Sequence, residues 1–175
     1  MTHLIWKNMK SYTAILETDA GDIHIDLFPD TAPNAVNSFK YQAESGIFDG
    51  AEIRSSYDGF EISFGDMAAP GYSFDVEFDD SRLFDGSGYI GFSFSEGQSF
   101  GRIFITNDIN AIYEMQIRQD CQETDISDDA ILQYVREKII RFSKANTVFG
   151  RIAEEDFDKL EQLNKGTVIN QIHFQ

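Results

Sequence analysis

The sequence predicts a mainly β domain of 175 residues with a helical insertion. Residues 22–28 alternate apolar and polar side chains, the pattern of a strand with one face in a core and one in water. Residues 50–106 are rich in glycine and aromatic residues, and short strands with frequent turns are typical of a barrel or a sandwich. Residues 107–146 contain no glycine or proline and repeat apolar residues at helical spacing, so we assign residues 108–144 to a helical insertion.

Strands are expected at both ends of the chain. Residues 11–18 and 22–28 are predicted to form a hairpin around a tight turn, and residues 147–152 and 167–174 are predicted to form two further strands. His24 lies between apolar residues of the second strand, so alternation puts it on the water-facing side. We therefore expect His24 to be an ordinary surface residue.

Capping residues mark the starts of two helices. Thr31 is the expected N-cap of the first helix, with Pro33 in its first turn, where the missing N–H costs little. Gly46 is expected to end this helix. Asp125 or Ser127 can cap a second helix inside the insertion.

The composition is that of a folded, strongly acidic protein. The formal net charge is −16, from 30 acidic and 14 basic residues, and such a surface disfavours binding to nucleic acid or to anionic membranes. We interpret the charge as that of a solvated surface; binding to a partner with a basic patch is the alternative. No segment approaches the ~20 apolar residues that span a bilayer, and the N-terminus lacks the features of a signal peptide. Cys121 is the single cysteine, so we expect a reducing compartment and a cytoplasmic protein.

Several stretches, in order along the chain, resemble the cyclophilin family of peptidyl-prolyl isomerases. They cover most of the chain outside the insertion. The stretches are residues 16–23, 27–33, 37–39, 59–66, 71–78, 104–106 and 148–152. The resemblance implies a closed eight-stranded antiparallel β-barrel capped by two α-helices, with residues 108–144 inserted into it.

The chemistry that the resemblance implies is rotation about the bond before proline. The barrier of ~20 kcal/mol comes from amide conjugation. A catalyst needs an apolar slot for the proline ring and a donor aimed at the imide nitrogen, which regains its lone pair as the bond twists. We therefore expect no metal and no organic cofactor, and a proline-containing peptide or protein as substrate.

The catalytic position departs from the family pattern. Ser55 stands where the family has its catalytic arginine, and Arg54 is its neighbour. Adjacent strand residues point to opposite faces, so Arg54 can substitute only if a one-residue bulge turns it inward. Arg102 aligns with a glutamine that faces the same groove, so it is the second candidate donor. The alternative for Arg102 is a simple ion pair with a nearby acid.

The pocket walls are partly kept. Phe60 and Phe104 align with the two aromatic residues that sandwich the proline, although a barrel could equally bury either of them as core. Other positions that touch substrate in the family have changed. They are occupied here by Glu61, Ser63, Ser95 and Asn146.

Three functions are compatible with these residues. The first is a peptidyl-prolyl isomerase with weakened or altered catalysis. The second is a non-catalytic peptide- or protein-binding module, whose partner would contact the helical insertion or the acidic face. The third is an enzyme built on carboxylates, with or without a metal, although the sequence shows no EF-hand pattern and no zinc-binding spacing. The dense acidic residues behind this third hypothesis are Asp66, Asp75, Glu77, Asp79 and Asp80.

Overall fold

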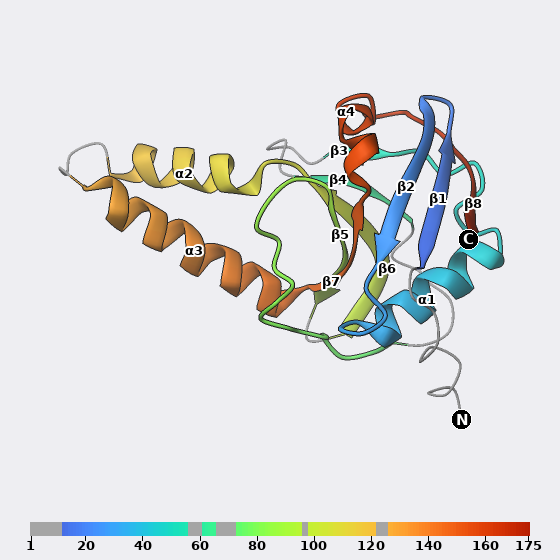
Figure 1. Cartoon of the computed structure of the whole chain (residues 1–175), viewed down its shortest axis with the longest axis horizontal. Coiled ribbons are helices and arrows are strands. Elements are labelled where there is room, and N and C mark those ends of the chain that lie inside the picture. Colours follow the sequence, from blue (N-terminus) through green and yellow to red (C-terminus); the bar gives the residue numbers. More distant parts are fainter. Residues whose placement is uncertain (1–11, 56–60, 66–72, 96–97, 122–125) are drawn as a thin grey trace.

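The computed structural model shows a mainly β protein with a curled antiparallel sheet and four α-helices in its described part (Figure 1). It describes residues 12–55, 61–65, 73–95, 98–121 and 126–175. The strands are β1 (Thr13–Thr18), β2 (Gly21–Leu27), β3 (Arg54–Ser55), β4 (Glu61–Phe64), β5 (Tyr89–Ser95), β6 (Gln98–Thr106), β7 (Thr147–Ile152) and β8 (Ile169–Phe174). The helices are α1 (Pro33–Glu44), α2 (Ile109–Asp120), α3 (Asp128–Ala145), the 3-10 turn η2 (Glu154–Asp156) and α4 (Phe157–Leu160).

The eight strands follow the order β3-β4-β6-β5-β7-β2-β1-β8. Chain segments beside the two edge strands bond to each other: the Ile53 N–H donates to the Thr167 carbonyl at 2.8 Å, and the Ile169 N–H donates to the Ala51 carbonyl at 2.9 Å. The sheet therefore curls far enough to bring its two ends together. Complete closure into a barrel stays a prediction.

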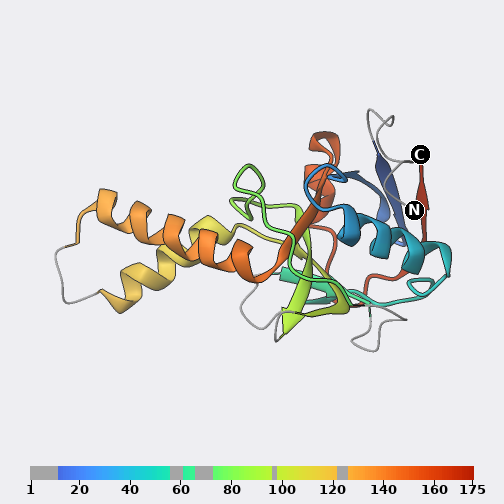
Figure 2. The same ribbon diagram turned by 90° about the horizontal axis from the view of Figure 1, so that it is seen from below.

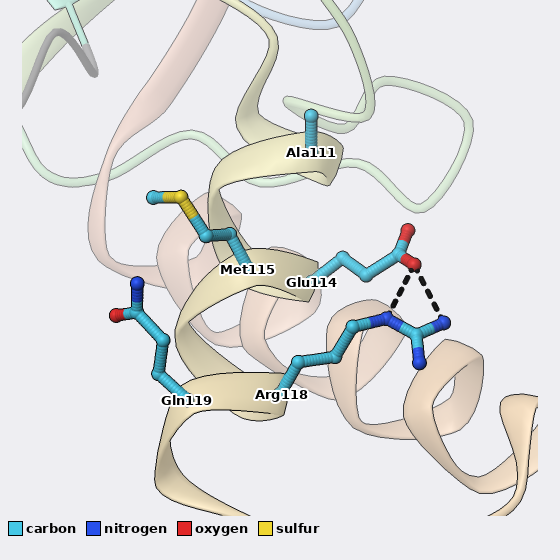
Figure 3. Close-up of a pocket in the computed structure, with 5 residues that line it drawn as sticks. All are labelled: Ala111, Glu114, Met115, Arg118 and Gln119. Atoms are coloured by element: carbon cyan, nitrogen blue, oxygen red, sulfur yellow. Dashed lines mark hydrogen bonds and ion pairs between the residues drawn. The ribbon is translucent and has the colours of Figure 1, made fainter. Parts of the chain in front are cut away.

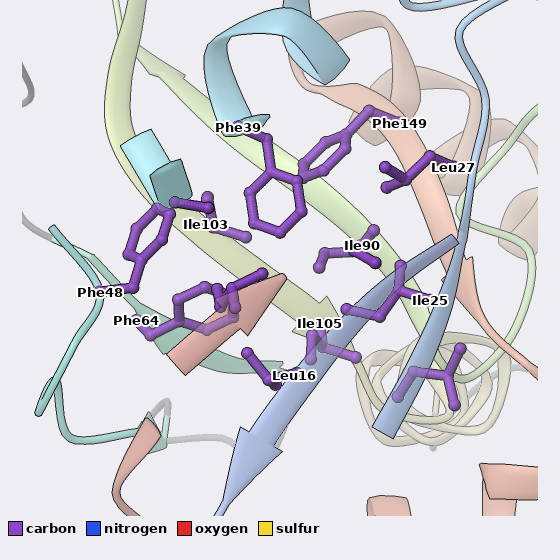
Figure 4. Packing of buried hydrophobic residues seen from close by; sticks show 14 of the residues in the cluster. Leu16, Ile25, Leu27, Phe39, Phe48, Phe64, Ile90, Ile103, Ile105 and Phe149 are labelled. Atoms are coloured by element: carbon purple, nitrogen blue, oxygen red, sulfur yellow. The ribbon is translucent and has the colours of Figure 1, made fainter. Parts of the chain in front are cut away.

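The main core fills the inside of this curl (Figure 4). As the alternation predicts, Ile23 and Ile25 of β2 are buried in it. Helix α1 contributes Phe39, whose ring centroid lies 5.9 Å from that of Phe48 and 5.2 Å from that of Phe149. Burying an aromatic or aliphatic side chain of this size stabilises the fold by roughly 1.5–3 kcal/mol. Contacts between aromatic side chains thus pack α1 against the sheet.

The start of α1 differs from the prediction. Thr31 is not the N-cap: that position belongs to Ala32, and Pro33 is the first helical residue. The Glu77 carboxylate caps the helix instead, accepting hydrogen bonds from the backbone N–H groups of Asn34 at 3.0 Å and Ala35 at 2.9 Å. This cap comes from 43 residues away in the chain, so no local pattern reveals it.

The end of α1 agrees with the prediction. The last helical residue is Glu44, Ser45 is the C-cap, and Gly46 follows with φ +70°. Glycine adopts this left-handed conformation without the steric cost that a Cβ would bring.

Helices α2 and α3 form a hairpin that extends away from the sheet (Figures 1 and 2). The Asp108 side chain caps α2, accepting from the Ala111 N–H at 3.1 Å. Of the two predicted candidates, Ser127 is the residue that caps α3, accepting from the Ala130 N–H at 3.3 Å. The base of the hairpin packs on the outer face of the sheet through a second buried cluster that includes Ile109. Whether residues 108–144 are an insertion into the domain stays a prediction.

His24 is more than the ordinary surface residue that the sequence predicts. Its side chain is 38% exposed, but its Nδ1 lies 2.7 Å from the Oδ2 of buried Asp156. A carboxylate only accepts hydrogen bonds, so Nδ1 is the donor. The other carboxylate oxygen, Oδ1, lies 2.7 Å from the Lys159 Nζ. This cluster ties β2 to the segment η2–α4.

Candidate functional site

The candidate site lies on the outer face of β3, β4 and β6. In the ladder, Arg54 stands opposite Ser63, and Ser63 stands opposite Phe104. Residues directly opposite each other in a sheet share a face, as do residues two apart in one strand. Arg54, Ser63, Phe104 and Arg102 therefore belong to one face. It is the outer face, because Ile103 on β6 turns into the main core.

The register bears directly on Arg54. The sequence alignment has Arg54 facing away from the groove unless a bulge intervenes. In the structure Arg54 pairs with Ser63, while Ser55 pairs with the core residue Ile62. Arg54 thus shares the face of Ser63 and Phe104 by simple strand pairing. The Arg54 side chain is exposed.

Phe104 is packed within an aromatic cluster and is only 1% exposed. Its ring centroid lies 5.1 Å from that of Phe84, in the segment before β5, and 5.8 Å from that of Phe142 on α3. Phe84 and Phe142 in turn contact each other at 5.1 Å, edge to face. The burial agrees with the core interpretation of Phe104. Its role as a wall of a proline pocket stays a prediction.

Gly91 makes room for this cluster. It stands opposite Phe104 in the β5–β6 ladder. A Cβ built on Gly91 would collide with the Phe84 ring and lie 2.8 Å from Cζ of Phe104. A glycine inside a strand often marks such a close approach. Gly91 is therefore the sequence signal that could have indicated close packing at this point of β5. The pairing with Phe84 had no signal in the sequence.

The remaining predicted site residues are only partly described. Phe60 lies outside the described residues, as do the side chains of Glu61 and Ser95. Asn146 follows α3 as its C-cap, and its side-chain amide donates to the Phe142 carbonyl at 3.0 Å. Its part in substrate binding stays a prediction.

Two residues of the shared face differ in their surroundings from exposed Arg54. Ser63 is buried, with 5% exposure. Arg102 is half-buried and already interacts with another group. The face therefore combines one exposed guanidinium, one half-buried guanidinium and a packed aromatic wall.

Two of the acidic residues behind the third hypothesis serve separate structural contacts. Glu77 caps α1, and Asp79 accepts hydrogen bonds from the side chain and the backbone N–H of Ser81. These bonds from Ser81 lower the pKa of Asp79. Asp66 lies outside the described residues. Over the described ranges, no three histidine, cysteine, aspartate or glutamate side chains group in a way that could hold a metal ion.

The outer surface of α2 mixes apolar residues, Ala111 and Met115, with a locally paired Arg118 and Glu114 (Figure 3). Arg118 donates from Nε to Glu114 at 2.9 Å, and its terminal nitrogen donates to Asp128 of α3 at 2.9 Å. Asp128 and then Glu114 raise the pKa of this guanidinium. Because Arg118 bonds to Glu114 of α2 and to Asp128 of α3, it links the two helices.

No helix in the part of the chain described here is both long and apolar enough to cross a membrane.

Fold and site together define a mainly antiparallel β protein whose outer sheet face carries arginine beside an aromatic wall. The family model described as "Cyclophilin type peptidyl-prolyl cis-trans isomerase/CLD" matches residues 13–173. The chain therefore belongs to the cyclophilin-type peptidyl-prolyl cis-trans isomerase family.

Individual relatives match over shorter stretches. Peptidyl-prolyl cis-trans isomerase cyp15 of Rhizopus delemar is 41% identical over 59 residues, which are 34% of this chain and 9% of that protein. A putative peptidyl-prolyl cis-trans isomerase of Staphylococcus haemolyticus is 38% identical over 56 residues, which are 32% of this chain and 28% of that protein. The match thus spans less than a third of either relative's length.

Solved structures agree in fold over almost the whole chain. A cyclophilin type peptidyl-prolyl cis-trans isomerase of Cryptosporidium parvum superposes with a TM-score of 0.68 at 17% identity, covering 94% of this chain and 98% of that one. The same protein in the presence of the dipeptide ala-pro gives a TM-score of 0.67 at 17% identity, covering 93% and 98%.

Proposed function

We propose that this chain is a peptidyl-prolyl cis-trans isomerase with weakened catalysis, acting on proline-containing peptides or proteins at the outer face of β3, β4 and β6. The observation that carries the proposal is the antiparallel register that pairs Arg54 with Ser63 and Ser63 with Phe104. This register supports the proposal because it puts a guanidinium, the donor that the reaction needs, on the same sheet face as an aromatic residue.

The mechanism needs a donor that bonds the imide nitrogen more strongly as the bond twists. Each 1.36 kcal/mol gained only in the transition state raises the rate tenfold. Arg54 is exposed, so water competes with its hydrogen bonds and weakens them. Arg102 is less exposed but already engaged with another group. Both features support a catalyst weaker than one with a dedicated, buried donor. Because Arg102 is already engaged, we favour Arg54 as the donor.

The relatives support the choice of substrate. Those named above are peptidyl-prolyl isomerases by name, and the solved relative of Cryptosporidium parvum was crystallised in the presence of ala-pro. A proline-containing peptide is therefore the substrate class we propose here.

We extend the proposal to the scaffold. Hydrogen bonds between residues 50–53 and 166–169 support a sheet closed into an eight-stranded barrel, which would hold the short strand β3 and its Arg54 in place. We also propose that residues 108–144 are an insertion able to contact a protein partner. The single cysteine, Cys121, fits a reducing compartment and supports a cytoplasmic location. We propose a role in protein folding there, because isomerisation of the bond before proline is a slow step of folding.

The test is an isomerisation assay on a short proline peptide, with wild type, Arg54→Ala, Arg102→Ala and the matched control Arg136→Ala. Arg136 is an exposed arginine on α3, away from the proposed face. We expect the wild type to accelerate the reaction, Arg54→Ala to lower kcat/KM about tenfold, which corresponds to about 1.4 kcal/mol, and Arg136→Ala to match the wild type. The proposal fails if the wild-type rate equals the uncatalysed rate, or if both Arg54→Ala and Arg102→Ala keep full activity.

A non-catalytic binding module is the second candidate. The 1% exposure of Phe104 favours it, because a buried ring cannot hold a proline ring in place during rotation, whereas exposed Arg54 on the same face can still contact a peptide. The two candidates separate when the same peptide is titrated against ¹⁵N-labelled protein. Saturable shifts on β4 and β6 without any acceleration of isomerisation would support the binding module; shifts accompanied by acceleration would support the isomerase.

A further inference from the structure

A second pocket lies outside the proposed prolyl face, between the outer side of β2, β7 and β5 and the segment η2–α4. Its volume is about 260 Å³. Asp26, Arg151 and Tyr89 line it and stand directly opposite one another on the three strands. Arg82, from the segment before β5, and Glu154 of η2 complete its polar lining. None of these five residues belongs to the site proposed above.

Aromatic rings hold the two guanidinium groups of this pocket. Cζ of Arg151 lies 4.9 Å from the ring centroid of Tyr89 and 5.0 Å from that of Phe157. Cζ of Arg82 lies 4.3 Å from the ring centroid of Phe28. Stacking of this kind uses the flat faces of a guanidinium and leaves its N–H edge available for an acceptor.

Neither arginine of this pocket has a charged partner in the described part of the chain. Neither guanidinium forms an ion pair with a carboxylate in the ranges that the structure covers. The Nε atoms of Arg82 and Arg151 are buried and have no hydrogen-bond partner there, which is destabilising. Two unpaired guanidinium groups thus belong to residues that line the same small pocket.

The positive charges of Arg82 and Arg151 both act on the phenol of Tyr89. Burial and a hydrogen bond with Asp85 raise the pKa of the Tyr89 phenol, while the positive charges of Arg151 and Arg82 act to lower it. Both guanidinium groups are therefore within electrostatic reach of the same phenol, although they come from different segments of the chain.

We infer that this pocket binds an oxyanion, the carboxylate or phosphate group of a small molecule, through the guanidinium groups of Arg82 and Arg151. Arginine presents its N–H groups as a fork that matches the oxygens of either anion. The volume accommodates one such group with a small organic substituent. Asp26 and Glu154 also line the pocket, so it disfavours further anionic groups on the ligand beyond the one that is bound and offers acceptors to a hydroxyl or amino group of the ligand.

The experiment is a titration of the full, ¹⁵N-labelled chain with sodium phosphate and, separately, with sodium acetate, against sodium chloride at equal ionic strength. We expect saturable shifts of the Tyr89 and Arg151 amides and of the arginine Nε–H signals with phosphate, acetate or both. A response to phosphate alone assigns the site to phosphate groups, and a response to acetate alone assigns it to carboxylates. Either outcome supports the inference.

Variants separate binding from packing. Arg82→Met and Arg151→Met keep most of the apolar side-chain volume, and each is expected to weaken binding at least tenfold. Arg118→Met is the matched control, because Arg118 is already paired with Glu114 and Asp128 and should leave binding unchanged. If Arg151→Met fails to fold, Arg82→Met carries the test, because Arg82 stacks on one ring only.

The inference is overturned if neither anion gives saturable shifts beyond those of chloride. It is equally overturned if folded Arg82→Met binds as tightly as the wild type, because the arginines would then serve packing alone.

Discussion

Replacing Asp156 with asparagine is expected to destabilise the protein at neutral pH and to do so less and less as the pH falls. Asp156 is buried, which by itself raises the pKa of its carboxyl group. Hydrogen bonds from Lys159 and from the backbone and ring of His24 outweigh this effect and lower the pKa from 3.8 to about 2. The native state therefore prefers the charged carboxylate more strongly than the unfolded chain does.

The shift sets both the size and the pH range of the effect. A difference of one pKa unit corresponds to 1.36 kcal/mol, so the native environment of Asp156 contributes on the order of 2 kcal/mol. Because the folded pKa is depressed, this stability is fully present above about pH 4 and is lost as the pH falls through about 2. In a chain of this length, 2 kcal/mol corresponds to roughly 4–8 °C in Tm.

Urea denaturation of the wild type and Asp156→Asn, repeated from pH 7 down to pH 2.5, measures the difference. Asp158→Asn is the matched control, since Asp158 is exposed and lies two residues further along the same segment. The reasoning is refuted if Asp156→Asn costs no more than Asp158→Asn at pH 7, or if its cost stays constant down to pH 2.5.

Two further predictions concern packing and capping, and both are read from urea denaturation midpoints at pH 7. Glu77→Ala removes the carboxylate that accepts hydrogen bonds from the first turn of α1, so the free energy of unfolding is expected to fall by about 1–2 kcal/mol. Asp75→Ala, at a neighbouring exposed position, is the control and should leave it unchanged. Equal effects of the two substitutions would contradict the capping role of Glu77. Gly91→Ala forces a methyl group against Phe84 and Phe104 and is expected to lower the free energy of unfolding by about 1–3 kcal/mol. Adding Phe84→Leu should restore part of this stability. If Gly91→Ala is as stable as the wild type, the aromatic cluster has room for the methyl group and the predicted clash does not occur.

Local sequence patterns predicted the features that depend on residues close together in the chain. Alternating side chains gave the β1–β2 hairpin, the predicted strand 147–152 coincides with β7, and Ser127 caps α3 as its position before two aspartates indicates. Each of these features depends on neighbours within a few residues, so the sequence holds the information needed to predict it.

Features that depend on distant segments could not be predicted. The cap of α1 comes from Glu77, and His24 finds Asp156 132 residues further along the chain. On β6, apolar residues occupy both faces: Ile103 enters the main core while Phe104 enters the second cluster. Alternation cannot tell two buried faces apart, which is why a core role and a groove role for Phe104 remained open. The facing of Arg54 depends on the pairing of a two-residue strand, a tertiary choice rather than a local one.

The second buried cluster links the helical hairpin to the proposed site. Ile131, Val135 and Ile139 of α3 belong to the same cluster as Phe104. Proteins open in cooperative units, and segments that share a core tend to open together. Amide hydrogens of α3 and of the middle of β6 should therefore exchange with solvent in one shared opening event. A molecule that binds to the α2–α3 hairpin would then slow amide exchange in the sheet as well.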